Sequence, residues 1–202
     1  MPEYLHDFPA FGPLTAWYQE LKSEGRIDQF LSNAKSEVVE WKHAEFAWYP
    51  EIPFAEELYG RKWSKETSDT IPHGLDSQGR LVFLEQLLIT AYCHHPNLIQ
   101  CVKVLRSPRG NWDLQAATHI LVNEDGKPLH VANIMDYRSS LNTFEYEDGR
   151  LARLISTNFE HPNIGHTDST ELPIQESDRL TKEFVYNSDG HVESGPEAYW
   201  SY

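Results

Sequence analysis

The chain has 202 residues, of which 40% are hydrophobic and 12% aromatic, and this composition predicts a packed globule and excludes a wholly disordered chain. Seventeen Lys and Arg against thirty-one Asp and Glu give a net charge of −14, which repels nucleic acid and anionic membranes and attracts basic proteins. Residues 1–60 carry 4 bases and 11 acids, residues 61–142 carry 9 and 8, and residues 143–202 carry 4 and 12. We therefore expect a protein partner with a basic surface, and neither nucleic acid nor a membrane as partner.

The cellular compartment is predicted from the segments that the sequence lacks. It has no apolar run of about eighteen residues, and its first residues have no basic and apolar signal region. Only Cys93 and Cys101 are present, too few for a disulfide framework or, by themselves, a zinc site. We expect a cytoplasmic protein with reduced thiols.

The first part of the chain, residues 1–55, has helical periodicity. After an irregular arm, Gly12-Pro13 opens a helix that Gly25 ends, with apolar residues on one side at Leu14, Trp17, Tyr18 and Leu21. A second helix is predicted from Arg26 to about Trp48, before Pro50. Two such helices in succession predict a helical hairpin packed on a sheet.

The second part, residues 56–202, has the pattern of an antiparallel sheet. The segments 81–84 and 87–89 fit a buried strand or a short helix equally well. Strands are predicted at Leu98–Leu105, Trp112–Val122, Leu129–Tyr137, Thr143–Glu147 and Leu151–Thr157. The predicted fold is α+β, a single domain over residues 1–202 with an N-terminal helical hairpin packed on a mainly antiparallel meander of β-hairpins.

The clearest hairpin spans residues 143–155. Asp148-Gly149 predicts a two-residue type I′ turn, because both central positions need positive φ and this dipeptide tolerates it. The turn sets a register with Glu147 opposite Arg150 and Tyr146 opposite Leu151; further along, Glu145 meets Ala152 and Phe144 meets Arg153. Phe144, Tyr146, Leu151 and Ile155 are then expected on one face.

Similar turn sequences recur at three other places. Asp125-Gly126 predicts a second hairpin, with Val122 opposite Leu129 and Ile120 opposite Val131. Residues 76–81 have a similar turn sequence with a longer loop, and residues 186–192 match the Asp-Gly hairpin pattern more weakly. The four glycines are unevenly spaced, so we predict strand pairs within one sheet and not a repeat array.

Two of these hairpins, Tyr146-Glu147-Asp148-Gly149-Arg150-Leu151 and Asp76-Ser77-Gln78-Gly79-Arg80-Leu81, resemble the tyrosine-aspartate (YD) repeat of Rhs-type bacterial toxins. In size, acidity and short hairpins of this type, the chain is also similar to immunity proteins of bacterial polymorphic toxin systems. The resemblance implies a cytosolic, non-catalytic protein that neutralises a cognate toxin domain by covering its active site or substrate surface, without a cofactor.

Acidic and aromatic residues of the C-terminal third are the candidate partner-binding residues. Residues 160–178 are polar and acidic without apolar periodicity, and a loop of this length is usually functional or mobile. The three aromatic residues at the C-terminus either pin the last strand or anchor an interface. The predicted contact residues are Glu145, Glu147, Glu160, Asp168, Glu171, Glu176, Asp178, Tyr199 and Trp200.

Catalytic motifs for dinucleotide, P-loop or serine-hydrolase chemistry are lacking. The alternative hypothesis is a metal-dependent or hydrolytic enzyme that uses His119 and His130, which the Asp125-Gly126 register places on one face, with Asp136 nearby. Cys93 beside His94 and His95 is a further candidate pair, but it requires a helix or turn, because adjacent strand residues point to opposite faces. We assign no catalytic or metal-binding residue, and the chain is predicted not to be an enzyme.

Overall fold

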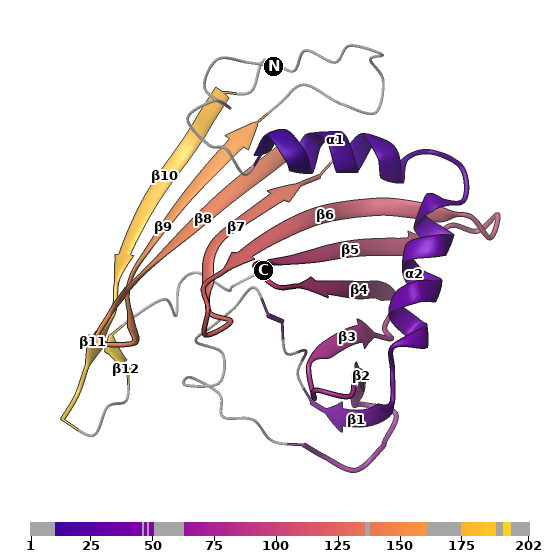
Figure 1. Ribbon diagram of the computed structural model, residues 1–202, viewed down its shortest axis with the longest axis horizontal. Helices are drawn as coiled ribbons and strands as arrows, with labels where there is room; N and C mark the ends of the chain where they lie inside the picture. Colours follow the sequence, from indigo (N-terminus) through magenta and orange to yellow (C-terminus); the bar gives the residue numbers. More distant parts are fainter. Residues whose placement is uncertain are drawn as a thin grey trace.

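The computed structural model describes residues 11–45, 47, 49–50, 63–135, 138–160, 175–188 and 192–194. In these residues, two helices precede a ten-stranded antiparallel sheet and a separate two-stranded hairpin (Figure 1). The ten strands lie side by side in sequence order, which is a meander. The predicted order of helices first and antiparallel hairpins after is confirmed, but the fold is richer in β structure than α+β implies. No helix of the described part is long and apolar enough to cross a membrane.

The first helix, α1, spans Phe11–Leu21, as its apolar spacing predicts. It buries Phe11, Leu14, Tyr18 and Leu21, and Pro13 lies in its first turn, where a missing N–H group is tolerated. Gly25, at φ 77°, separates it from α2, Arg26–Ser36. The helical hairpin is therefore as predicted in its first half.

The predicted extension of the second helix to Trp48 is wrong. The helix ends at Ser36, and residues 40–44 form strand β1, Glu40–Ala44, which pairs with β2, Ile71–Leu75. The β-branched pair Val38-Val39 at the junction disfavours a further helical turn. Residues 1–55 are thus not wholly helical, because β1 gains backbone partners from a strand about thirty residues away.

The remaining strands follow the predicted hairpins closely. Of the segments that fitted a strand or a helix, residues 81–84 form a strand, and residues 87–89 contribute Leu88 and Ile89 to the start of another. The bounds are β3 Leu81–Leu84, β4 Leu88–His95, β5 Leu98–Arg106, β6 Trp112–Val122, β7 Pro128–Ile134, β8 Arg138–Glu147, β9 Arg150–Glu160, β10 Gln175–Glu183, β11 Val185–Tyr186 and β12 Val192–Ser194.

Both faces of the large sheet carry buried apolar residues. The helices pack on one face, here called the helix side, whose buried cluster includes Phe83, Ala91, Val102, Ala117 and Ala132. The alternate residues form a second cluster on the opposite side, which includes Leu84, Tyr92, Cys101, Ile120 and Val131. Because α1 and α2 contact β3, β4, β6 and β7, part of the helix side lies beyond them.

The β8–β9 turn has the predicted two-residue form, with Asp148 at φ 50° and Gly149 at φ 77°. Glu147 pairs with Arg150 and Tyr146 with Leu151, as predicted, but the register then shifts by one residue. Beyond this bulge Glu145 pairs with Arg153 and Phe144 with Leu154. The predicted pairs of Glu145 with Ala152 and of Phe144 with Arg153 are therefore wrong, and Leu154 takes the buried place expected for Ile155.

The β6–β7 turn differs from the predicted two-residue form. Asn123 N donates to Lys127 O at 2.9 Å and Gly126 N to Asn123 O at 2.9 Å, which defines a three-residue loop with Gly126 at φ 77°. The Asn123 side chain accepts hydrogen bonds from two backbone N–H groups of this loop. Ile120 pairs with Val131 as predicted, but Val122 pairs with Pro128 and not with Leu129.

Candidate functional surface

The β6–β7 and β8–β9 turns are tied together at one end of the sheet. Lys127 Nζ donates a hydrogen bond to the carbonyl oxygen of Gly149. The Tyr146 hydroxyl donates to the carbonyl oxygen of Pro128 at 2.8 Å. Each hairpin therefore donates a side-chain hydrogen bond to a backbone carbonyl oxygen of the other, so the two turns form one unit.

This end of the sheet is densely acidic. Glu183 of β10 pairs with Arg153 of β9, which places it beside the same turns. We define the acidic end as the six exposed carboxylates Glu124, Asp125, Glu145, Glu147, Asp148 and Glu183.

The three bases of this region are each held by another group. Lys127 bonds Gly149 and lies over the Tyr146 ring, 5.6 Å from its centroid. Arg150 lies over the Tyr186 ring at 5.4 Å. Arg153 bonds Glu145 at 2.9 Å and lies 3.9 Å from Glu183, so it bridges two carboxylates. Counted together with Lys127, Arg150 and Arg153, the six carboxylates leave a formal charge of −3; Lys182, which precedes Glu183 on β10, is outside this count.

Two tyrosines form an aromatic border to the acidic end. Tyr146 and Tyr186 are half-buried and pack against the buried cluster of the opposite side. The Tyr186 hydroxyl donates to the carbonyl oxygen of Leu151 at 2.9 Å. The hydroxyl group of each ring is therefore anchored to the backbone of a neighbouring strand.

The structure brings only part of the predicted contact set together. Glu145 and Glu147 lie at the acidic end, whereas Glu160, Glu176 and Asp178 belong to the opposite ends of β9 and β10. About ten residues of extended strand separate Arg150 from Glu160, which at the rise of a β-strand is roughly 30 Å. Residues 175–178, expected in the long loop, are part of β10. Asp168, Glu171, Tyr199 and Trp200 lie outside the described residues.

A row of polar side chains crosses β4, β5 and β6 on the helix side. Cys93 Sγ lies 3.6 Å from His95 Nε2, which lies 3.2 Å from Gln100 Oε1. Gln100 Nε2 lies 3.3 Å from His119 Nε2, and the Trp17 ring stacks on His119 with centroids 5.0 Å apart. The Cys–His pair survives in a strand because its members are two residues apart, whereas His94 faces the other side and bonds the carbonyl oxygen of Leu81 at 2.8 Å.

The charge states in this row follow from burial. Desolvation lowers the pKa of His119 to about 4, aided by the nearby His95, so the imidazole is neutral at pH 7 and its Nε2 accepts a hydrogen bond from the Gln100 amide N–H. Burial, together with the Glu37 carboxylate, raises the pKa of the Cys93 thiol. The thiol form therefore dominates at neutral pH, which disfavours Cys93 as a nucleophile.

The predicted proximity of His119 and His130 is confirmed by the register, in which His119 pairs with Ala132 and Leu121 with His130. Each imidazole is engaged by a neighbour: His130 Nδ1 lies 3.1 Å from Thr143 Oγ1, and burial lowers its pKa. Asp136 lies outside the described residues. Among the residues that the structure describes, no three His, Cys, Asp or Glu side chains are grouped to hold a metal.

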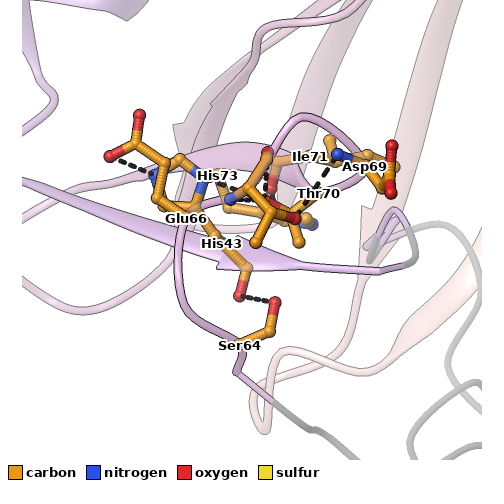
Figure 2. Close-up of polar contacts among 8 residues, drawn as sticks. His43, Ser64, Glu66, Asp69, Thr70, Ile71 and His73 are labelled. Carbon is orange, nitrogen blue, oxygen red and sulfur yellow. Dashed lines mark hydrogen bonds and ion pairs between the residues drawn. The ribbon is translucent and has the colours of Figure 1, made fainter.

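A second group of polar contacts lies around β1 and β2 (Figure 2). His43 Nδ1 lies 3.5 Å from Thr70 Oγ1, and its Nε2 lies 4.0 Å from the exposed Glu66. His73 is fully buried, and its Nδ1 donates to the carbonyl oxygen of Ile71 at 2.8 Å. These bonds are local to one corner of the sheet, where Ser64 also bridges to β1. We assign this group a role in holding the segment 63–70 against β1.

Sequence reasoning missed four members of the acidic end: Glu124, Asp125, Asp148 and Glu183. The repeated order of acid, Asp-Gly and base at residues 124–127 and 147–150 was the available signal. It shows two similar turns but not that they touch. Only the meander, which places consecutive hairpins side by side, brings them together.

Comparison with known proteins finds no matching family, no matching curated protein and no matching solved structure.

Proposed function

We propose that the chain is a non-catalytic immunity protein of a bacterial polymorphic, Rhs-type toxin system, which binds a cognate toxin domain and covers its active site or substrate surface. The observation that supports this proposal best is the acidic end, where six exposed carboxylates surround two turns that are tied together by Lys127. It acts in the cytoplasm and needs no cofactor.

The chemistry of the expected partner matches this surface. A toxin domain that acts on nucleic acid or nucleotides needs a basic cleft to hold phosphates. Carboxylates at fixed positions compete for such a cleft, accelerate association and set the orientation of the complex. Because the turns are already ordered, less conformational entropy is lost on binding than with a flexible acidic tail.

Rigid aromatic residues supply the remaining part of the interface. Tyr146 and Tyr186 border the acids and offer large contact areas at low conformational cost. Their hydroxyl donors are already satisfied within the chain, so burial of the rings under a partner leaves no donor unpaired.

The test requires a candidate toxin domain, which is sought first among the neighbouring genes. Co-expression is expected to relieve toxicity, and the two proteins are expected to co-purify at equal stoichiometry. The triple variant Glu124→Lys, Asp125→Lys, Glu147→Lys is expected to lose protection. A matched triple variant, Glu24→Lys, Asp69→Lys, Asp113→Lys, makes the same change in net charge at other exposed acids and is expected to retain it. Equal protection by both variants would exclude the acidic end as the binding surface.

A further inference from the structure

Three polar atoms from β4 and β5 converge on the open part of the helix side. Cys93 Sγ and Gln100 Oε1 both approach His95 Nε2, at 3.6 and 3.2 Å. Cys93 and Gln100 are directly paired across the two strands, and His95 is two residues from Cys93 on the same face. Cys93 and Gln100 are half-buried and His95 is exposed, so the group is open to solutes on one side.

These separations match those between ligands of a tetrahedral metal ion. Bond lengths of about 2.3 Å to sulfur and about 2.0 Å to nitrogen at a tetrahedral angle put the two ligand atoms roughly 3.5 Å apart. The same calculation for nitrogen and oxygen ligands gives roughly 3.4 Å. The observed distances of 3.6 Å between Cys93 Sγ and His95 Nε2 and 3.2 Å between His95 Nε2 and Gln100 Oε1 are close to these two values.

We propose that Cys93, His95 and Gln100 form a binding site for a divalent cation of the zinc class. The Cys93 thiolate and the His95 imidazole are its strong ligands, the Gln100 carbonyl oxygen is the third, and water completes the tetrahedron. Binding releases the thiol proton to solvent, while the His95 proton moves to Nδ1 by exchange with water and leaves Nε2 free to bind the ion.

Nearby charge favours a cation at this position. Glu37, the residue that follows α2, acts electrostatically on Cys93 more strongly than the opposing Arg80. In the described residues no third His, Cys, Asp or Glu completes the group, so the expected affinity is below that of a structural zinc site. The site is independent of the proposed binding of a toxin domain.

Cadmium is the direct probe, because its bond to a thiolate gives a charge-transfer band in the ultraviolet. Titration of the full chain, with no histidine tag, is expected to give a saturating band and a stoichiometry of one ion per chain. Cys93→Ser is expected to abolish the band, and His95→Gln to weaken binding at least about tenfold. Zinc is expected to compete for the same site and to erase the band.

Two further variants test the assignment of the ligands. His94→Gln, which removes the neighbouring imidazole on the opposite face, is expected to leave binding unchanged. Gln100→His replaces a weak ligand by a strong one and is expected to tighten binding at least about tenfold; unchanged binding in this variant would contradict the role of Gln100. The absence of a saturating band in the wild-type chain, or a band that survives Cys93→Ser through Cys101, would overturn the proposal.

Discussion

Lys127 and Gly149 lie on different turns and are joined by a hydrogen bond from the lysine Nζ to the glycine carbonyl oxygen. This contact engages the basic side chain of the β6–β7 turn and makes the carboxylates of both turns parts of a single surface. The acidic end therefore depends on a contact between residues that are far apart in sequence.

Replacement of Lys127 by Met is expected to lower the free energy of unfolding by about 0.5–1 kcal/mol, because an exposed hydrogen bond from a charged donor is lost. Lys65→Met removes an exposed lysine elsewhere and is the control, with little expected change. Urea denaturation at pH 7 measures both. Equal stabilities of the two variants would show that the contact between the turns contributes nothing.

Asp76 is expected to be the most sensitive carboxylate of the described turns. It is 6% exposed and accepts bonds from Gln78 N and Arg80 N, at 2.9 Å each, and from the Arg80 guanidinium at 2.7 and 2.8 Å. Asp76→Ala is expected to cost about 2–3 kcal/mol, since these donors lose their acceptor. Asp125→Ala, an exposed acid in the equivalent β6–β7 turn, is the control, and a cost as small as that of the control would contradict the prediction.

The same carboxylate predicts a pH dependence. Burial by itself raises the pKa of Asp76, but the hydrogen bonds from Arg80 and Gln78 outweigh it and hold the pKa below the ordinary 3.8. Its stabilising contribution is therefore complete above pH 3.8 and is lost as the pH falls through the folded-state pKa. The stability difference between wild type and Asp76→Asn is expected to shrink only in that acidic range; a difference that already shrinks between pH 7 and 5 would contradict this assignment.

Protonation of His119 is expected to add a second pH dependence of stability, at less acidic pH than that of Asp76. Its pKa is about 4 in the folded chain and 6.5 ordinarily, so between these values the unfolded chain binds more protons. Stability is thus expected to fall as the pH drops from about 6.5 to about 4, by at most about 1.4 kcal/mol per pH unit from this group. NMR titration of the His119 ring is expected to give a midpoint near 4. His119→Gln is expected to flatten the stability profile, and a midpoint at 6.5 would refute the effect of burial.

Gly74 of β2 allows Val38, which lies between α2 and β1, to approach the sheet closely. A Cβ atom at this position would lie 2.7 Å from a methyl carbon of Val38 and 3.2 Å from Cβ of Phe83. Gly74→Ala is expected to destabilise the fold by about 1–3 kcal/mol. In the double variant with Val38→Ala the second substitution is expected to cost less, because the clashing methyl groups are gone. Strict additivity of the two costs would show that the predicted clash is absent.

The sequence predicts local features of this fold well. The Asp148-Gly149 turn depends on two residues that tolerate positive φ, and both adopt it. The apolar spacing of α1 and of α2, which is the first half of the predicted second helix, is likewise a local property. The bulge at residues 151–153 has no such signal in the sequence. Arg153 therefore pairs with Glu145, to which it is also ion-paired, and not with the predicted Phe144.

Non-local pairing explains the remaining differences. Residues 40–44 satisfy a helical pattern, but their backbone pairs with Ile71–Leu75, which sequence periodicity cannot reveal. For the same reason, the sequence identified Glu145 and Glu147 but not Glu124 or Asp125, whose turn is joined to theirs by Lys127. It also assigned Glu160 to the same surface, although strand length places it at the far end of β9.

The most direct test of the acidic end as a binding surface is the association rate constant with a candidate toxin domain, the proposed partner, measured by stopped-flow over a range of ionic strengths. We expect the rate constant to fall steeply with added salt in the wild-type chain and in the control triple variant of Glu24, Asp69 and Asp113. In the triple variant of Glu124, Asp125 and Glu147 we expect slow association with little dependence on salt. Identical salt dependence in all three proteins would contradict the proposal.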